Sequence, residues 1–353
     1  MTQRRHLTFW IVTLVVFVFL LWLLRDILLP FVAGIALAYL QTPLADRLER
    51  RGMNRAVAAL LIVGGVVLTF VLVAVLLAPI LVQQGAALVA TIPAFVQRLQ
   101  ALTSDAGPAW LRAFLPEGDG GKAASDLVAQ GINYLTALLR SLWAGGRALA
   151  SFISVLVIMP VVTFYLICDW HKMVATLDGW VPPQYRDTVH RLVRDIDAAI
   201  SGFLRGQSAV CLIAGCYYAL ALTLIGLKFG LLIGLGAGVL TFMPYVGALA
   251  GLLIGASVAV AQFWPQWGPI AAVVGVFLLG EFVEGNVLAP KLVGEHVGLH
   301  PVWLIFAMFT FGYLFGFVGL LIAVPLGAAI AVLLRFALRQ YFASPLYTGD
   351  KPS

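Results

Sequence analysis

The sequence predicts an all-α polytopic membrane protein with about eight membrane segments, on three observations. Of its 353 residues, 62% are hydrophobic and 11% are charged, whereas soluble domains carry about 25% charged residues. The apolar residues gather in runs of about 20, the length that crosses a hydrocarbon core of ~30 Å. Two longer uncharged runs, 229–261 and 302–334, are interrupted in the middle and are predicted to form helical hairpins.

Three conventional spans form the predicted N-terminal scaffold, residues 1–82. The first, 7–24, is longer than the apolar stretch of a signal peptide and precedes no small-residue cleavage site, so we expect it to stay uncleaved. The second, 27–40, is shorter and contains a proline and a glycine. The third, 56–82, is continuous, and its length suits a full crossing of the bilayer.

Two amphipathic segments separate the remaining conventional spans. Residues 83–147 contain several prolines and a Gly-rich stretch, and we expect extracytoplasmic amphipathic helices around a loop. Residues 148–201 hold a fourth span, 148–168, and lead into an interfacial helix, 183–203. That helix has apolar residues on one face and charged residues on the other, at a period of 3.6 residues.

The predicted transport core is 202–335, and a cytoplasmic tail, 336–353, follows it. The core begins with a fifth span, 209–227, and its two hairpins flank one further helix, 268–286. Each hairpin is either two short spans or a re-entrant pair of half-helices. Sliding the chain by 72 residues aligns the hairpins as a weak internal repeat. Paired, interrupted apolar segments of this kind indicate a transporter binding site.

Lysine and arginine in short loops predict the orientation. Basic residues gather at the N-terminus, after the second span, after the fourth span and at the C-terminus, so both termini are expected in the cytoplasm. The net charge of +6 therefore indicates membrane orientation rather than nucleic-acid binding. The lipid bilayer is the expected partner of most of the surface.

No enzyme motif is present in the sequence: G-x-S-x-G, H-E-x-x-H, a Walker A loop and C-x-x-C are all missing. We expect no catalytic residue, no cofactor and no metal site. The cysteines, Cys168, Cys211 and Cys216, lie in or beside apolar runs and are interpreted as buried small residues rather than a disulfide framework.

The first candidate site is the segment 202–207, before the fifth span. Arg205 and Gln207 are predicted to line the inner mouth of a solute pathway. The alternative is a loop-to-helix turn that holds Arg205 in the headgroup layer, where arginine is common.

The second candidate is the tip of the first hairpin, with Pro244, Tyr245 and Gly247. If the tip lies at membrane depth, its free backbone groups must line a cavity or pack on protein, and would bind a polar solute directly. We favour a tip at membrane depth because each arm of the hairpin has only about 15 residues, which is short for a complete span. The alternative is a plain loop at the membrane surface.

The third candidate follows more than fifty uncharged residues. Glu281 and Glu284 stand three apart and share a helix face, while Asn286 and Pro290 predict that the helix ends or unwinds. An ionisable group inside a membrane indicates function by default. The alternative places the segment outside the bilayer, with Glu284 paired to Lys291.

Three motifs, in this order and spacing, resemble the autoinducer-2 exporter family of PerM-like permeases over nearly the whole chain: Gly202-Phe-Leu-Arg-Gly-Gln207, Pro244-Tyr-Val-Gly247, and Glu284-Gly-Asn-Val-Leu-Ala-Pro-Lys291 through Gly298-Leu-His-Pro301. The resemblance implies efflux of a furanone-type quorum-sensing signal or another small solute. It also implies a homo-pentamer in the bacterial inner membrane, whose hairpins move as an elevator. Some members look instead like sodium or lithium/proton antiporters.

Three functions remain open on the sequence. The first is secondary export of a small polar metabolite such as autoinducer-2. The second is cation/proton antiport with Glu284 as the carrier, which predicts pH-dependent exchange of sodium or lithium for protons. The third is a membrane scaffold, which predicts no solute flux and no effect of Glu284→Gln beyond stability.

Overall fold

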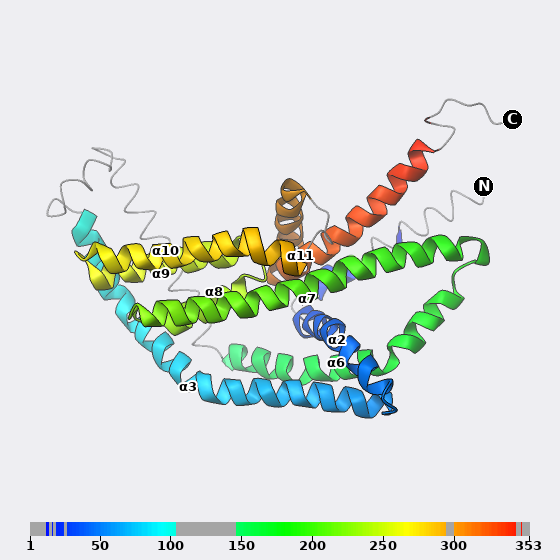
Figure 1. The fold of residues 1–353 in the computed structure, drawn as a ribbon, viewed down its shortest axis with the longest axis horizontal. Coiled ribbons are helices and arrows are strands. Elements are labelled where there is room, and N and C mark those ends of the chain that lie inside the picture. Colours follow the sequence, from blue (N-terminus) through cyan, green and yellow to red (C-terminus); the bar gives the residue numbers. More distant parts are fainter. Residues whose placement is uncertain are drawn as a thin grey trace. The chain divides into compact units, whose positions relative to one another are not determined.

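A computed structural model describes residues 27–103, 146–293 and 300–343, with Tyr347 and some positions of 12–24 (Figure 1). All regular structure in these ranges is helical, which confirms the all-α class. The elements are α2 (Leu28–Glu49), α3 (Arg55–Thr103), α6 (Gly146–Gly179), η1 (Pro183–Tyr185), α7 (Arg186–Leu224), α8 (Gly230–Leu240), α9 (Val246–Phe263), α10 (Trp267–Val283), η2 (Glu284–Val293) and α11 (Pro301–Phe342).

Within the described ranges, seven helices are long and apolar enough to cross a membrane, and α8 is a shorter apolar helix. The protein is therefore a polytopic membrane protein, as predicted. The expected first span, 7–24, and much of the expected segment 83–147 lie outside the described residues.

Two predicted boundaries fall inside continuous helices. α3 runs through the expected end of the third span at residue 82, and α7 joins the amphipathic segment to the fifth span. The loop-to-helix turn considered for residues 202–207 is therefore wrong, because these residues lie in the middle of α7. The predicted faces of its first half are confirmed: Val189, Leu192 and Ile196 are partly buried, whereas Arg191 and Arg194 are exposed.

The chain divides into two compact units. Unit 1 comprises Met1–Leu68, Ser154–Ala209 and Leu288–Ser353, and unit 2 comprises Thr69–Ile153 and Val210–Val287. The first hairpin belongs to unit 2 and the second to unit 1. The functional division into scaffold and transport core stays a prediction.

In unit 1, small residues allow α2 to pack closely on α3 and α6. Ala38, Ala45, Ala59 and Ile167 form part of its apolar core. Arg55, at the start of α3, ties these helices together at one end. Its Nε donates to the Ile167 carbonyl at 2.7 Å, and its Nη1 lies 3.2 Å from Asp46 and 2.6 Å from Glu49.

In unit 2, the second half of α7 packs with α8, α9 and α10 around Tyr218, Val273 and Phe277. The face of α8 toward α7 consists of Gly230, Gly234 and Gly238, each so close to the α7 backbone that a Cβ would collide with it. Glycines at every fourth position let membrane helices approach to backbone contact, which gains van der Waals packing where the hydrophobic effect gives none.

Both long uncharged runs are interrupted where the sequence predicted. α8 and α9 pack against each other on either side of residues 241–245, where Tyr245 has a φ of 67°. α11 is broken at Gly316, with φ 61° and ψ −138° (Figure 1). The chain turns back there, because a Cβ on Gly319 would meet the Phe311 carbonyl. That the two hairpins superpose as repeats stays a prediction.

Candidate functional site

The helix that carries the two glutamates changes form at Glu284. α10 ends at Val283, and residues 284–293 continue as a π-helix, η2, which contains Pro290. The Asn286 amide folds back and donates to the Phe282 carbonyl at 2.8 Å. The predicted end or unwinding is therefore a widening of the helix, in a rare form that is frequently found at functional sites.

The hairpin tip and the glutamates lie at the same end of the α9–α10 pair. α9 runs antiparallel to α10, and the missing side chains of Gly251 and Gly255 make room for the Phe277 ring. One turn further toward the tip, the register brings Gly247 on α9 level with Glu281 on α10. This register supports the predicted proximity of the tip to Glu284, while their direct contact stays a prediction.

The tip residues differ in exposure. Tyr245 is exposed and Pro244 partly buried, while Gly247 is buried with its backbone against α8. A Cβ at Gly247 would lie 2.6 Å from the Ala237 carbonyl oxygen, so only glycine allows the two arms to meet this closely.

Neither glutamate forms an ion pair among the described residues. Both are partly buried. Lys228, the only basic residue of 210–287, lies at the far end, where its backbone N–H donates to Gln262 at 2.7 Å. Gln262 is roughly 24 Å along α9 from the tip. Lys291 is exposed and belongs to unit 1, so its pairing with Glu284 stays an alternative from the sequence.

Tyr218 on α7 is a polar residue at this site that sequence reasoning missed. Its side chain is fully buried, and its hydroxyl has no hydrogen-bond partner among the described residues. The phenol lies over Gly280, one helical turn before Glu284. A tyrosine inside an apolar span was the available signal, because a buried phenol usually finds a partner.

The segment 202–207 contacts the end of η2 within unit 1. A Cβ at Gly206 would collide with the Leu292 carbonyl, so the two backbones touch. Arg205 donates from Nε to the Ser201 carbonyl at 3.0 Å and from Nη2 to the Ser201 hydroxyl at 2.9 Å. Gln207 is buried and has an interaction partner. The structure thus brings the first and third sequence motifs together at Gly206.

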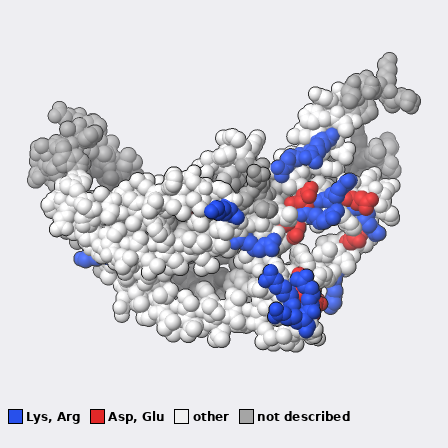
Figure 2. Space-filling model, viewed as in Figure 1, with Lys and Arg blue, Asp and Glu red and all other residues white. Residues whose placement is uncertain are grey.

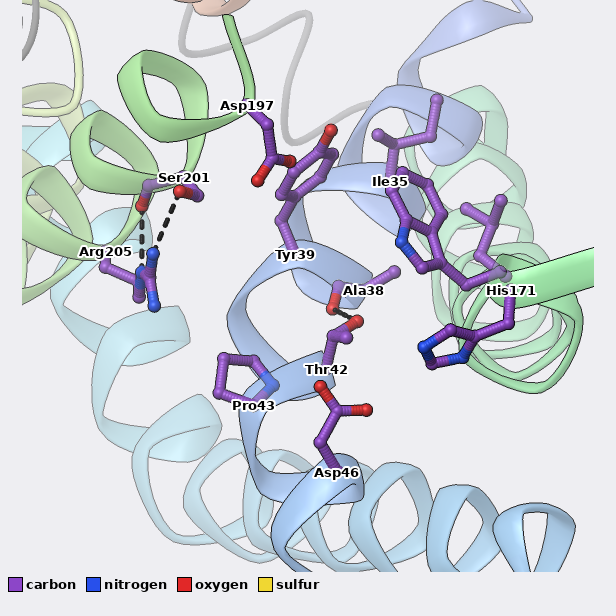
Figure 3. Close-up of a pocket in the computed structure, with 12 residues that line it drawn as sticks. Ile35, Ala38, Tyr39, Thr42, Pro43, Asp46, His171, Asp197, Ser201 and Arg205 are labelled. Atoms are coloured by element: carbon purple, nitrogen blue, oxygen red, sulfur yellow. Dashed lines mark hydrogen bonds between the residues drawn. The ribbon is translucent and has the colours of Figure 1, made fainter. Parts of the chain in front are cut away.

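Arg205 also lines a pocket of about 290 Å³ between α2, α6 and α7, entirely within unit 1 (Figure 3). The Asp197 carboxylate lies beside Tyr39, and Asp46 is held by Arg55. Gln207 is not among the lining residues. The pocket gives Arg205 access to a polar space, but the predicted inner mouth of a pathway stays a prediction.

The expectation for the cysteines holds only in part. Cys168 and Cys211 are partly buried, and all three cysteines are free thiols. Cys216 is exposed on the outer face of α7. An exposed small apolar residue is compatible with a lipid-facing surface, which the interpretation as buried residues overlooked.

The structure combines three features of a membrane transporter: membrane-spanning helices, interrupted hairpins, and carboxylates within an apolar helix. The chain belongs to the AI-2E transporter family, because the profile described as "AI-2E family transporter" matches residues 11–339.

Three relatives cover most of the chain. It is 28% identical over 330 residues to "Putative transport protein YrrI" of Bacillus subtilis, with 90% of this chain and 89% of the relative covered. It is 27% identical over 312 residues to "Putative permease PerM" of Escherichia coli, with 88% and 87% covered. It is 22% identical over 302 residues to "Putative transport protein YueF" of Bacillus subtilis, with 85% and 80% covered.

Proposed function

We propose that this transporter exports a small polar metabolite, with autoinducer-2 as the leading candidate, and that Glu284 belongs to the solute site. The observation that carries the proposal is a partly buried carboxylate at the start of a π-helix, one helical turn after Gly280, on which the buried phenol of Tyr218 lies. Among the described residues, Glu284 forms no ion pair. A carboxylate at membrane depth costs several kcal/mol unless it is hydrated, paired or protonated. A hydroxyl-rich solute would supply hydrogen bonds to both groups.

Cation/proton antiport is the second candidate. It is favoured by the same glutamates, since Glu281 and Glu284 have no ion pair among the described residues. A carboxylate that alternates between a proton and a sodium or lithium ion needs to be free of a fixed basic partner. In this case the flux would depend on pH and on the cation, and would need no organic solute.

The proposed transport cycle follows the family resemblance. The two hairpins would move as an elevator within each protomer of a homo-pentamer in the bacterial inner membrane, with both termini in the cytoplasm. Supporting features are the glycine-rich hairpin 229–261, which packs through small residues, and the break at Gly316. Cross-linking and mass measurement of the purified complex would test the assembly.

Transport by purified protein in vesicles tests the function. We expect flux of autoinducer-2 or a sodium/lithium–proton exchange in the parent, and a fall of about tenfold or more in Glu284→Gln, because hydrogen bonds to charged groups contribute about 1.5–3 kcal/mol. Asn286→Ala should also lower transport. Asp187→Asn, on the exposed charged face of α7, is the matched control and should transport as the parent does.

The outcomes separate the candidates. Solute flux that falls in Glu284→Gln supports the exporter, and pH-dependent cation exchange without solute flux supports the antiporter. If both variants assemble and carry every tested solute at the parental rate and pH dependence, the site assignment is wrong. If the parent carries nothing, the protein is a scaffold.

A further inference from the structure

A groove of about 600 Å³ lies between the first half of α7 and the last part of α11, both in unit 1. Arg191 on α7 and Arg335 and Arg339 on α11 line it, with Asp195 as the one carboxylate among the described lining residues. Figure 2 shows basic side chains gathered along these parts of the two helices, with acidic ones beside those of α7. The groove is distinct from the pocket beside Arg205 and from the glutamates of η2.

The groove has an excess of positive charge that the described residues do not neutralise. Arg335 and Arg339 are four apart on one helix face, an arrangement of like charges that destabilises a helix when no anion lies between them. Both are exposed, and neither forms an ion pair among the described residues. Arg191 has one long hydrogen bond, 3.5 Å to Thr188. Guanidinium groups grouped in this way suit phosphate, which they bind through paired N–H donors.

The remaining wall of the groove is apolar. Leu192 on α7 and Val332 and Phe336 on α11 line it beside the arginines. Arg335 is the first charged residue after the uncharged run 302–334, so it marks the level at which α11 leaves the hydrocarbon. A ligand there meets guanidinium groups on one side and lipid-like surface on the other.

We propose that this groove binds an anionic phospholipid, with its phosphate on Arg335, Arg339 and Arg191 and an acyl chain along Leu192 and Phe336. A free phosphate ion would use the arginines but leave the apolar wall uncovered. A zwitterionic lipid would cover the wall but bring a positive headgroup to a basic groove. Basic pockets between membrane helices bind anionic headgroups by this combination of contacts.

The test uses the full-length protein in a neutral detergent. Retained lipid is counted by native mass spectrometry, and melting temperature is followed during titration with dioleoyl phosphatidylglycerol, with dioleoyl phosphatidylcholine, or with inorganic phosphate. The groove variant is Arg335→Gln with Arg339→Gln, and Arg191→Gln is a milder one. The matched control, Arg50→Gln with Arg194→Gln, removes the same charge from exposed positions of unit 1 that do not line the groove.

We expect phosphatidylglycerol to bind about 25-fold more weakly to the double groove variant, since each of the two arginines near an anionic headgroup contributes about fivefold. Arg191→Gln should weaken binding about fivefold, and the control should bind as the parent does. Parental binding by both groove variants would overturn the proposal. So would equal losses in groove variant and control, equal binding of phosphatidylcholine, or phosphate stabilising the parent as strongly as phosphatidylglycerol does.

Discussion

The phenol of Tyr218 lies directly over the backbone of Gly280, where any Cβ would collide with the ring and its hydroxyl. Both residues are buried in unit 2, and the Tyr218 ring also stacks on Phe277, with centroids 4.9 Å apart. The contact fixes the distance between α7 and α10 just before Glu284. Position 280 therefore has to be glycine for the phenol to pack against α10 at this level.

Gly280→Ala should lower the stability of unit 2 because the added methyl group overfills a packed contact, at a cost of about 1–3 kcal/mol. Gly275→Ala, on the same helix, is the control, since nothing lies within 4 Å of the position a Cβ would take. The melting temperature of detergent-purified protein measures both. A Gly280→Ala variant that melts with or above Gly275→Ala would show that α7 and α10 do not meet in this way.

The positions of breaks and faces could be predicted from the sequence because they depend on local chemistry. Pro244 and Gly316 interrupt uncharged runs through their own backbone properties, and the charges of 186–195 are exposed because the helical period places them on one face. The sequence did not reveal that α7 is continuous. A loop-to-helix turn was one alternative for residues 202–207, but they lie inside α7, where Gly206 packs on the Leu292 backbone.

The candidate site was harder to predict than the fold. Glu284 stands out because a carboxylate in an apolar run has a cost that is visible in the sequence. Tyr218 is a weaker signal, because tyrosine is also ordinary in membrane helices. Only the packed structure shows that its hydroxyl has no hydrogen-bond partner among the described residues. The Arg191–Arg335–Arg339 groove likewise joins helices more than a hundred residues apart, and spacing along the chain carries no sign of it.

Gly316→Ala should destabilise the second hairpin through the backbone alone. With φ 61° and ψ −138°, Gly316 occupies a conformation that an L-residue reaches only with strain, at about 1–3 kcal/mol. Space is not limiting there, because nothing lies within 4 Å of the added Cβ. Gly236→Ala in α8 has equally open space and helical geometry, so it should be neutral or stabilise by up to ~1 kcal/mol. A Gly316→Ala variant that melts at a higher temperature than Gly236→Ala would argue against a hairpin at Gly316.

The orientation can be tested with a single cysteine at Arg50, an exposed position at the end of α2. The native Cys168, Cys211 and Cys216 are first replaced by alanine. The basic loop is expected in the cytoplasm, so a membrane-impermeant maleimide should label Arg50→Cys only after permeabilisation. Ser104→Cys, in the segment predicted outside, should react in intact cells. Ready labelling at position 50 in intact cells would show that the orientation is the reverse of the predicted one.

Tyr218→Phe separates a structural role of the phenol from a role in the solute site. The hydroxyl is buried without a partner among the described residues, and an unsatisfied buried polar group costs about 1–3 kcal/mol. Removing it should leave stability unchanged or raise it by ~1 kcal/mol. If the hydroxyl binds the solute beside Glu284, the same variant should bind that solute about fivefold to tenfold more weakly, the effect of one lost hydrogen bond.

The two readouts are measured on one preparation, as melting temperature and as the concentration dependence of transport in vesicles. Tyr217→Phe is the matched control, because its hydroxyl donates to the Val276 carbonyl at 3.2 Å on the neighbouring helix and is expected to be purely structural. It should lower stability slightly and leave solute affinity unchanged. A Tyr218→Phe variant with parental affinity would place the phenol outside the solute site, and Glu284 would then have to bind the solute without it.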